Sequence, residues 1–96
     1  MNIEVKAVHF SIREESREYL DKKIKRIPNA ENMIVDLLFT FTKEKLFKAV
    51  CTVNFRWGLS THVSEEDYEL LPAIDKLIDK LEAKIIKEKE KVKEKY

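Results

Sequence analysis

Cysteine, glycine and histidine are scarce in this 96-residue sequence, and each scarcity argues against a class of site. The single cysteine, Cys51, cannot form an internal disulfide, which fits a reducing compartment such as the cytoplasm. Two histidines and one cysteine argue against a metal site, which needs three or four converging ligands. With Gly58 as the only glycine, the chain has no glycine-rich phosphate-binding loop. We therefore expect no catalytic residue, no cofactor and no metal.

Long apolar runs are missing as well. No stretch is long enough to span a bilayer, and residues 1–10 alternate between apolar and polar side chains instead of forming the apolar block of a signal peptide. Ninety-six residues correspond to one small domain that can fold alone, and the chain contains no linker or repeat. These features predict a single domain over residues 1–96, with no membrane segment and a cytoplasmic location.

The charge is nearly balanced over the whole chain but unevenly distributed along it. The formal net charge is +1. Residues 12–27 carry six basic and four acidic side chains, residues 76–96 carry eight and five, and residues 28–69 carry four and seven. The two basic segments would attract a polyanion such as nucleic acid. The alternative is that both are solvated helix faces held by ion pairs between residues four apart.

The first third of the chain predicts a strand followed by a helix. Residues 2–8 alternate between apolar and polar side chains, which is typical of a half-buried strand. Either Ser11 or Arg13 is expected to end the connection after this strand. Ser11 and Glu14 have the spacing of a capping box, which supports a helix start near Ile12. It is expected to run to about residue 27, with Leu20 on its inner face.

Three more strands are expected in the middle of the chain, over residues 33–42, 47–57 and 59–64. The inward-facing set of the first is Met33, Val35, Leu37, Phe39 and Phe41. In the strand over residues 47–57, Cys51 falls on the inner face and is interpreted as a small buried hydrophobe. The acidic residues 65–67 are expected to precede the last helix, because carboxylates favour a helix N-terminus.

The last helix carries an apolar stripe and a lysine stripe. It is expected to begin at Asp67 or Pro72 and to extend to residue 95. Side chains at steps of three and four residues share one helix face. The apolar stripe consists of Ile74, Leu77, Ile78, Leu81 and Ile85, and the lysine stripe of Lys76, Lys80, Lys84, Lys87, Lys91 and Lys95.

The predicted order of elements is strand, helix, three strands and helix. The first helix connects two parallel strands in a right-handed crossover, and the later strands form an antiparallel meander. This order predicts an α+β fold, a two-layer sandwich in which both helices cover one face of a four-stranded sheet. The other face is expected to be solvated. We also expect the two helices to lie side by side, with their basic flanks merged into one surface.

Three stretches carry a family resemblance. Residues 1–27 contain a strand, a helix entry and a basic helix end, residues 49–53 read Ala-Val-Cys-Thr-Val, and residues 73–81 read Ala-Ile-Asp-Lys-Leu-Ile-Asp-Lys-Leu. They resemble the short ribosome hibernation-promoting factors, also called ribosome-associated inhibitors, over nearly the whole chain. In the first stretch the matching positions are Ile12, Arg17, Tyr19, Lys23, Arg26 and Ile27. Long members of this family carry a second, dimerising domain, which this chain is expected to lack.

The resemblance implies a fold similar to double-stranded RNA-binding domains and binding to 16S rRNA of the small ribosomal subunit, in the groove used by mRNA and tRNA. It implies inhibition of translation under stress by sterically blocking tRNA, with no catalysis, no small-molecule substrate and no membrane partner. Basic residues of both helices would contact rRNA phosphates, which position a protein without reading sequence. The candidate residues are Lys22, Lys23, Arg26, Lys80, Lys84, Lys87 and Lys91.

Two other functions stay open at this point. The chain is alternatively a stand-alone module that binds double-stranded RNA, or a protein-interaction module that uses the solvated sheet face or the charged helix. The roles of Phe55 and Trp57 also stay open. They either stack on nucleic-acid bases or cover the core, and the second is the commoner role for aromatic residues at a strand end.

Overall fold

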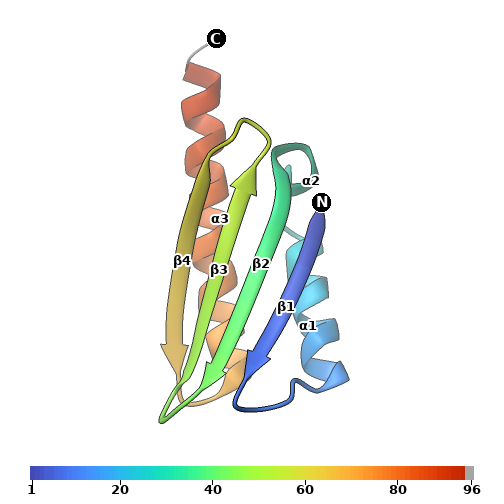
Figure 1. Ribbon diagram of the computed structural model, residues 1–96. Coiled ribbons are helices and arrows are strands. Elements are labelled where there is room, and N and C mark those ends of the chain that lie inside the picture. The colour runs from blue at the N-terminus through green and yellow to red at the C-terminus, as the bar shows by residue number, and fades with distance from the viewer. Residues whose placement is uncertain (95–96) are drawn as a thin grey trace.

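The computed structural model describes residues 1–94, and the side chains of residues 1–91. Its elements are β1 (Asn2–Val8), α1 (Glu14–Lys25), α2 (Ala30–Met33), β2 (Ile34–Lys43), β3 (Phe47–Phe55), β4 (Ser60–Asp67) and α3 (Leu70–Glu94). The four strands form one sheet in the order β1-β2-β3-β4, shown in Figure 1. The predicted order of long helices and strands is confirmed, and α2 is an addition to it.

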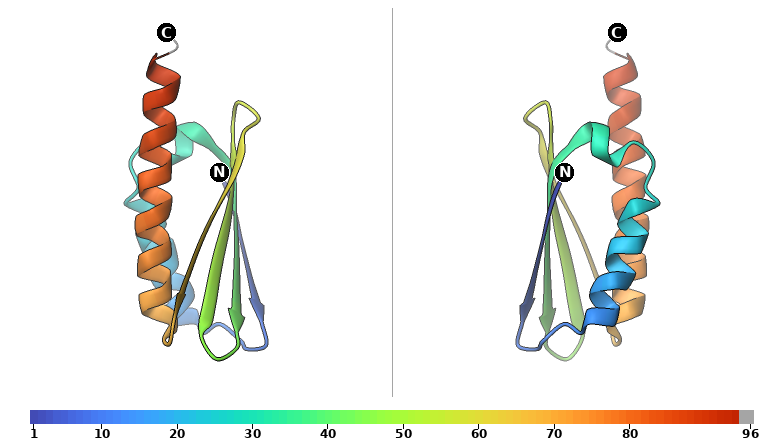
Figure 2. Two further views of the ribbon diagram at one scale, coloured as in Figure 1. Left: turned by 90° about the vertical axis from the view of Figure 1, so that its left-hand side faces the viewer. Right: turned by 90° about the vertical axis from the view of Figure 1, so that its right-hand side faces the viewer.

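The strand directions follow from the connections between them. Because α1 carries the chain back across the sheet, β1 and β2 pair in parallel. The shorter connections after β2 and β3 reverse the chain, so these strands pair antiparallel. Figure 2 shows α1 and α3 on the same face of the sheet, with the other face uncovered. The predicted two-layer α+β sandwich is therefore confirmed.

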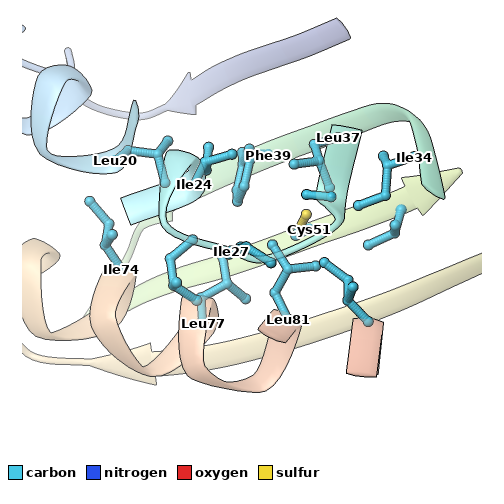
Figure 3. Close-up of a cluster of buried hydrophobic side chains, with 14 of the residues drawn as sticks. Leu20, Ile24, Ile27, Ile34, Leu37, Phe39, Cys51, Ile74, Leu77 and Leu81 are labelled. Atoms are coloured by element: carbon cyan, nitrogen blue, oxygen red, sulfur yellow. The ribbon is translucent and has the colours of Figure 1, made fainter. Parts of the chain in front are cut away.

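The core lies between the sheet and the two long helices. In Figure 3, Leu20 and Ile24 of α1 and Ile74, Leu77 and Leu81 of α3 point toward the sheet. The sheet contributes its inward-facing side chains, which have almost no exposed surface: Leu37, Phe39, Phe41, Ala49, Cys51 and Val53. Burial of these apolar side chains is the main force that holds the helices to the sheet.

Cys51 lies in this core and is completely buried. Its burial raises the pKa of the thiol to about 12, since an apolar environment disfavours the thiolate. The interpretation of Cys51 as a small buried hydrophobe is confirmed.

The first helix begins later and ends earlier than predicted. It starts at Glu14 after Arg13, an extended residue that makes no side-chain capping hydrogen bond, so the capping box of Ser11 and Glu14 is wrong. The backbone bends after β1 at His9, which has a φ of 68°, and Phe10 and Ile12 pack against the core, so the connection stays non-helical as far as Arg13. The helix ends at Lys25 rather than near residue 27.

The start of the second strand is also different. The chain first makes the short helix α2, after Asn29 in a left-handed conformation with φ of 66°. A β-bulge between Ile34 and Asp36 then shifts the alternation, so that Ile34 is buried and Val35 is 46 % exposed. The predicted inward position of Val35 is wrong because a single inserted residue reverses which side chain faces the core.

The fourth strand is longer than predicted, and the last helix begins between its two predicted starts. β4 continues through Glu65 and Glu66 to Asp67, so these residues are part of the sheet and not a lead-in to a helix. α3 begins at Leu70, which puts Pro72 in the first turn, where a proline removes no helical hydrogen bond. The predicted end at residue 95 lies outside the described residues.

Within residues 1–94, no helix combines the length and the apolar character that crossing a membrane requires.

Candidate functional site

A three-residue cluster joins α1 to α3. The hydroxyl of Tyr19 donates a hydrogen bond to Oδ1 of Asp75, and Nζ of Lys23 lies 3.4 Å from the same oxygen. Lys23 also sits 5.5 Å from the centre of the Tyr19 ring, within the range of a cation–π contact. One carboxylate of α3 therefore fixes two side chains of α1, and the helices lie side by side as predicted.

The protonation of this cluster follows from its contacts. The hydrogen bond to Asp75 raises the pKa of Tyr19, because that bond needs the phenol to keep its proton. The hydrogen bond and charge of Asp75 also raise the pKa of Lys23, because a nearby carboxylate favours the ammonium form. At neutral pH, Lys23 is a cation whose charge is partly committed to Asp75.

A second set of contacts joins α3 to the edge strand β4. Nζ of Lys76 lies 2.9 Å from Asp67, and Nζ of Lys80 lies 2.8 Å from Glu65. Both lysines also donate to backbone carbonyls of β4, Lys76 to Glu66 at 3.4 Å and Lys80 to Ser64 at 3.1 Å. Because β4 is an edge strand, one side of its backbone has no partner strand, and the two lysines cover part of that side.

The spacing of the two elements explains the match. Residues two apart on a strand are about 6.7 Å apart along its axis, and residues four apart on a helix are about 6 Å apart. Glu65 and Asp67 therefore meet Lys80 and Lys76 in register. The hydrogen bond from Lys80 lowers the pKa of Glu65, and that from Lys76 lowers the pKa of Asp67. The hydrogen bond to Asp67 in turn raises the pKa of Lys76.

These contacts separate the basic groups that were predicted to merge. Asp75 marks the flank of α3 that faces α1, and Asp79, one turn later, shares that flank. Lys76 and Lys80 mark the other flank, along β4. Helical spacing puts Lys84, Lys87 and Lys91 on the β4 flank as well, and Lys95 lies outside the described residues. The predicted merger of the two basic flanks is therefore wrong, because an acidic strip of α3 lies between them.

The seven candidate residues differ in how their charges are engaged. Lys23 and Lys80 pair with Asp75 and Glu65, and Lys91 lies 3.4 Å from the buried carboxylate of Glu88. The other four form no ion pair among the side chains of residues 1–91: Lys22, Arg26, Lys84 and Lys87. Two zones of uncompensated charge result, one at the end of α1 and one on the β4 flank of α3.

Sequence reasoning missed the roles of Asp75, Glu65 and Asp67. The only ion pairs considered for the last helix were between residues four apart along it, whereas Asp75 pairs across to α1. The acidic residues were assigned to a helix start, although Glu65 and Asp67 have the period of two that a strand face requires. Two carboxylates spaced two residues apart, followed by two lysines spaced four apart in the next helix, could have indicated that a strand and a helix pair through these charges.

The fold and its charges define a small α+β protein that presents cations from the helix layer of a two-layer sandwich. Residues 3–93 match the family described as sigma 54 modulation protein / S30EA ribosomal protein, and the chain belongs to that family.

Individual relatives agree with this assignment. The ribosome hibernation promoting factor of Azotobacter vinelandii is 28% identical over 91 residues, which cover 95% of this chain and 85% of that protein. A ribosomal subunit interface protein from Coxiella burnetii has a similar structure, with a TM-score of 0.79, 27% identity and coverage of 93% of this chain and 98% of that chain. The N-terminal domain of Thermus thermophilus Protein Y matches with a TM-score of 0.77, 27% identity, 88% of this chain and 96% of its own.

Proposed function

We propose that this protein binds the small ribosomal subunit in the groove used by mRNA and tRNA and keeps inactive ribosomes from translating. The family match over residues 3–93 carries the proposal. A relative named as a ribosome hibernation promoting factor and a structural neighbour named as a ribosomal subunit interface protein support it. Because bacterial ribosomes work in the cytoplasm, we propose the same location for this protein.

The proposed contacts are between helix cations and phosphates of 16S rRNA. Each lysine or arginine that neutralises a phosphate releases condensed counterions, so binding is favoured by entropy and weakens as salt rises. Lys22 and Arg26 on one side, and Lys84 and Lys87 on the other, form no ion pair within residues 1–91 that would have to break first. Two separated zones suit a folded RNA, which is recognised largely by shape and backbone.

Lys23, Lys80 and Lys91 are proposed as secondary contacts. The ion pairs of Lys23 and Lys80 are partly exposed, and exposed pairs contribute little net free energy, so exchange of a carboxylate for a phosphate is feasible there. Lys91 is itself exposed, although its partner Glu88 is buried. In the free protein, Lys23 links α1 to α3 and Lys80 links α3 to β4, whereas Lys91 pairs with Glu88 of its own helix.

The proposed mechanism is steric and needs no chemical step. A protein whose principal dimensions are 45 × 21 × 20 Å and which occupies the tRNA groove excludes tRNA from the same volume. The core shared by both helices and the sheet matters here, because the blocking volume has to persist while the ribosome is inactive.

Co-sedimentation with purified small subunits over a salt series tests the proposal. We expect binding that weakens from about 50 to about 500 mM monovalent salt and that competes with tRNA. Binding that is as tight to naked duplex RNA as to subunits would indicate a duplex RNA-binding module instead. A protein that binds neither subunits nor duplex RNA at low salt would contradict the proposal and favour a protein-interaction module.

A further inference from the structure

Exposed apolar side chains gather at one end of the sheet. The structure has seven large hydrophobic residues that are exposed among those described: Met1, Val35, Trp57, Leu59, Tyr68, Leu71 and Ile86. The first four lie where β1 and β2 begin and where β3 turns into β4, the end toward which α3 also runs (Figure 1). Trp57 is the largest of them and is 43 % exposed.

The turn between β3 and β4 explains why an aromatic residue is held in this position. The backbone N–H of Gly58 donates to the carbonyl of Phe55 at 3.1 Å, and the N–H of Phe55 donates to the carbonyl of Leu59 at 2.8 Å. Gly58 has a φ of +87°, which a residue with a side chain adopts only with strain. This three-residue hairpin loop sets Arg56 and Trp57 at the corner of the turn.

One side of the indole is already stacked. The rings of Phe55 and Trp57 have centroids 5.0 Å apart and an interplanar angle of 21°. Stacking on the buried Phe55 covers one face of the indole, so the exposed surface of Trp57 is on its other face and its edges. The result is a flat aromatic surface on a buried aromatic support.

Arg56 anchors the turn and adds a positive charge next to Trp57 in the chain. Its backbone N–H donates to the carbonyl of Met33 at 2.9 Å, and its Nη2 donates to the carbonyl of Glu31 at 3.0 Å. These bonds tie the turn to α2, so the aromatic surface is held in place before any ligand arrives. Arg56 forms no ion pair among the described side chains, and a guanidinium has five N–H donors, most of which stay available.

We propose that Trp57 is a stacking site for an unpaired RNA base and that Arg56 contacts the neighbouring phosphate. Aromatic side chains beside a cation are the usual means of holding single-stranded nucleic acid without reading its sequence. A flat surface suits a base better than it suits a protein side chain, which would need a hollow. The inference rests on the proposed function, since the RNA would be a single-stranded part of the ribosomal groove, either rRNA or mRNA.

Fluorescence offers a direct test because Trp57 is the only tryptophan in the chain. Single-stranded oligoadenylate and oligouridylate are titrated into the protein at low salt, with inorganic polyphosphate of equal charge as a polyanion without bases. We expect both RNAs to quench the emission of Trp57 and polyphosphate to leave it unchanged. Equal quenching by polyphosphate, or no quenching by either RNA, overturns the stacking site.

Substitutions at Trp57 separate stacking from simple apolar contact. Trp57→Phe keeps an aromatic ring and is expected to bind the oligonucleotides within about threefold of the parent. Trp57→Leu keeps an apolar side chain without a ring and is expected to bind about tenfold more weakly. Undiminished RNA binding by Trp57→Leu overturns the proposal. Far-UV circular dichroism checks that each variant folds. If Trp57→Leu does not fold, the binding of Trp57→Phe and the emission titrations of the parent protein still test the proposal.

Failure of this inference and failure of the proposed function give different results. If subunits bind the protein but neither the emission nor the Trp57→Leu variant shows an effect, stacking fails and ribosome binding stands. If the oligonucleotides quench Trp57 but subunits do not bind, the stacking site stands and ribosome binding fails.

Discussion

Lys80 and Lys84 are one helical turn apart on α3, yet their surroundings differ. Lys80 reaches Glu65 and a backbone carbonyl of β4, whereas Lys84 forms no ion pair within residues 1–91. At the scale of the residue, a lysine is a structural contact or an available cation according to what lies beside it. Counting lysines on a stripe therefore overstates the charge that a polyanion meets.

Cys51 gives a prediction that depends on a single buried group. Since burial raises the pKa of its thiol to about 12, the reactive thiolate is rare at neutral pH and shielded from solvent. Iodoacetamide at pH 8 is expected to label the native protein at least about 100-fold more slowly than the protein in denaturant. Mass spectrometry measures the labelling, and equal rates in the two conditions would show that Cys51 is accessible.

Elements meet through pairs of complementary charges in this protein. Asp75 links α3 to α1, and Lys76 and Lys80 link α3 to β4, so α3 has polar contacts on both flanks and apolar contacts beneath. The same helix also carries Lys84 and Lys87. One helix therefore holds the sandwich together with some of its charges and presents others to a partner.

The α3–β4 contact predicts how stability depends on acid. The folded-state pKa values of Glu65 and Asp67 are depressed below their ordinary values of 4.5 and 3.8. Their stabilisation is therefore fully present above these values and is lost as pH falls through the depressed values. We expect Glu65→Gln with Asp67→Asn to lower the melting temperature at pH 7, with a difference from the parent that shrinks below about pH 4.

Thermal unfolding followed by circular dichroism at pH 7 and at pH 3 measures this difference. Glu4→Gln, on the uncovered sheet face, is the matched control and is expected to change the melting temperature little at either pH. A difference that is the same at both pH values would show that the two carboxylates contribute nothing through their ionised forms.

The available lysines of α3 predict a loss of binding without a loss of stability. Lys84→Glu with Lys87→Glu is expected to weaken small-subunit binding at least about tenfold and to flatten the plot of log affinity against log salt by about 1.5. Lys6→Glu with Lys48→Glu makes the same change of charge on the opposite layer, where both side chains are exposed. Equal losses in the two double variants would mean that total charge, not the α3 flank, controls binding.

The whole molecule is an elongated sandwich with one continuous core. Figure 2 shows α3 continuing past the end of the sheet, which accounts for the longest dimension of 45 Å. Both helices and the inner sheet face share one cluster of buried side chains. A single shared core favours unfolding in one cooperative step.

Leu77 tests this cooperativity, because it is fully buried where α3 meets the core. Leu77→Ala is expected to lower the free energy of unfolding by about 3 kcal/mol, through lost burial and the cavity left behind. In urea titrations of the parent and the variant, Trp57 emission and helical circular dichroism are expected to change together. Separate transitions for the two signals would show that the hairpin end of the sheet unfolds independently of the helices.

Local patterns were sufficient for most of the fold. Alternation in residues 2–8 and 47–57 and the apolar stripe of α3 predicted these elements and their inner faces correctly, although β3 ends at Phe55 and not at residue 57. Patterns failed at Val35, where a bulge reverses the alternation, and at Ser11, where a capping box is absent. Both errors have the same origin, because packing against distant residues decides the outcome at those positions.

The amino-acid order alone was enough to establish the layers, the strand directions and the two basic segments, since periodicity, chain connectivity and residue charge are local properties. The folded arrangement was needed to tell which cations are engaged, because Asp75 meets α1, and Glu65 and Asp67 meet α3, across distances in the chain that no local pattern spans. It also divided the basic surface into two zones, with the acidic residues of α3 between them. Charge interactions depend on separation in space, and only folding determines that separation.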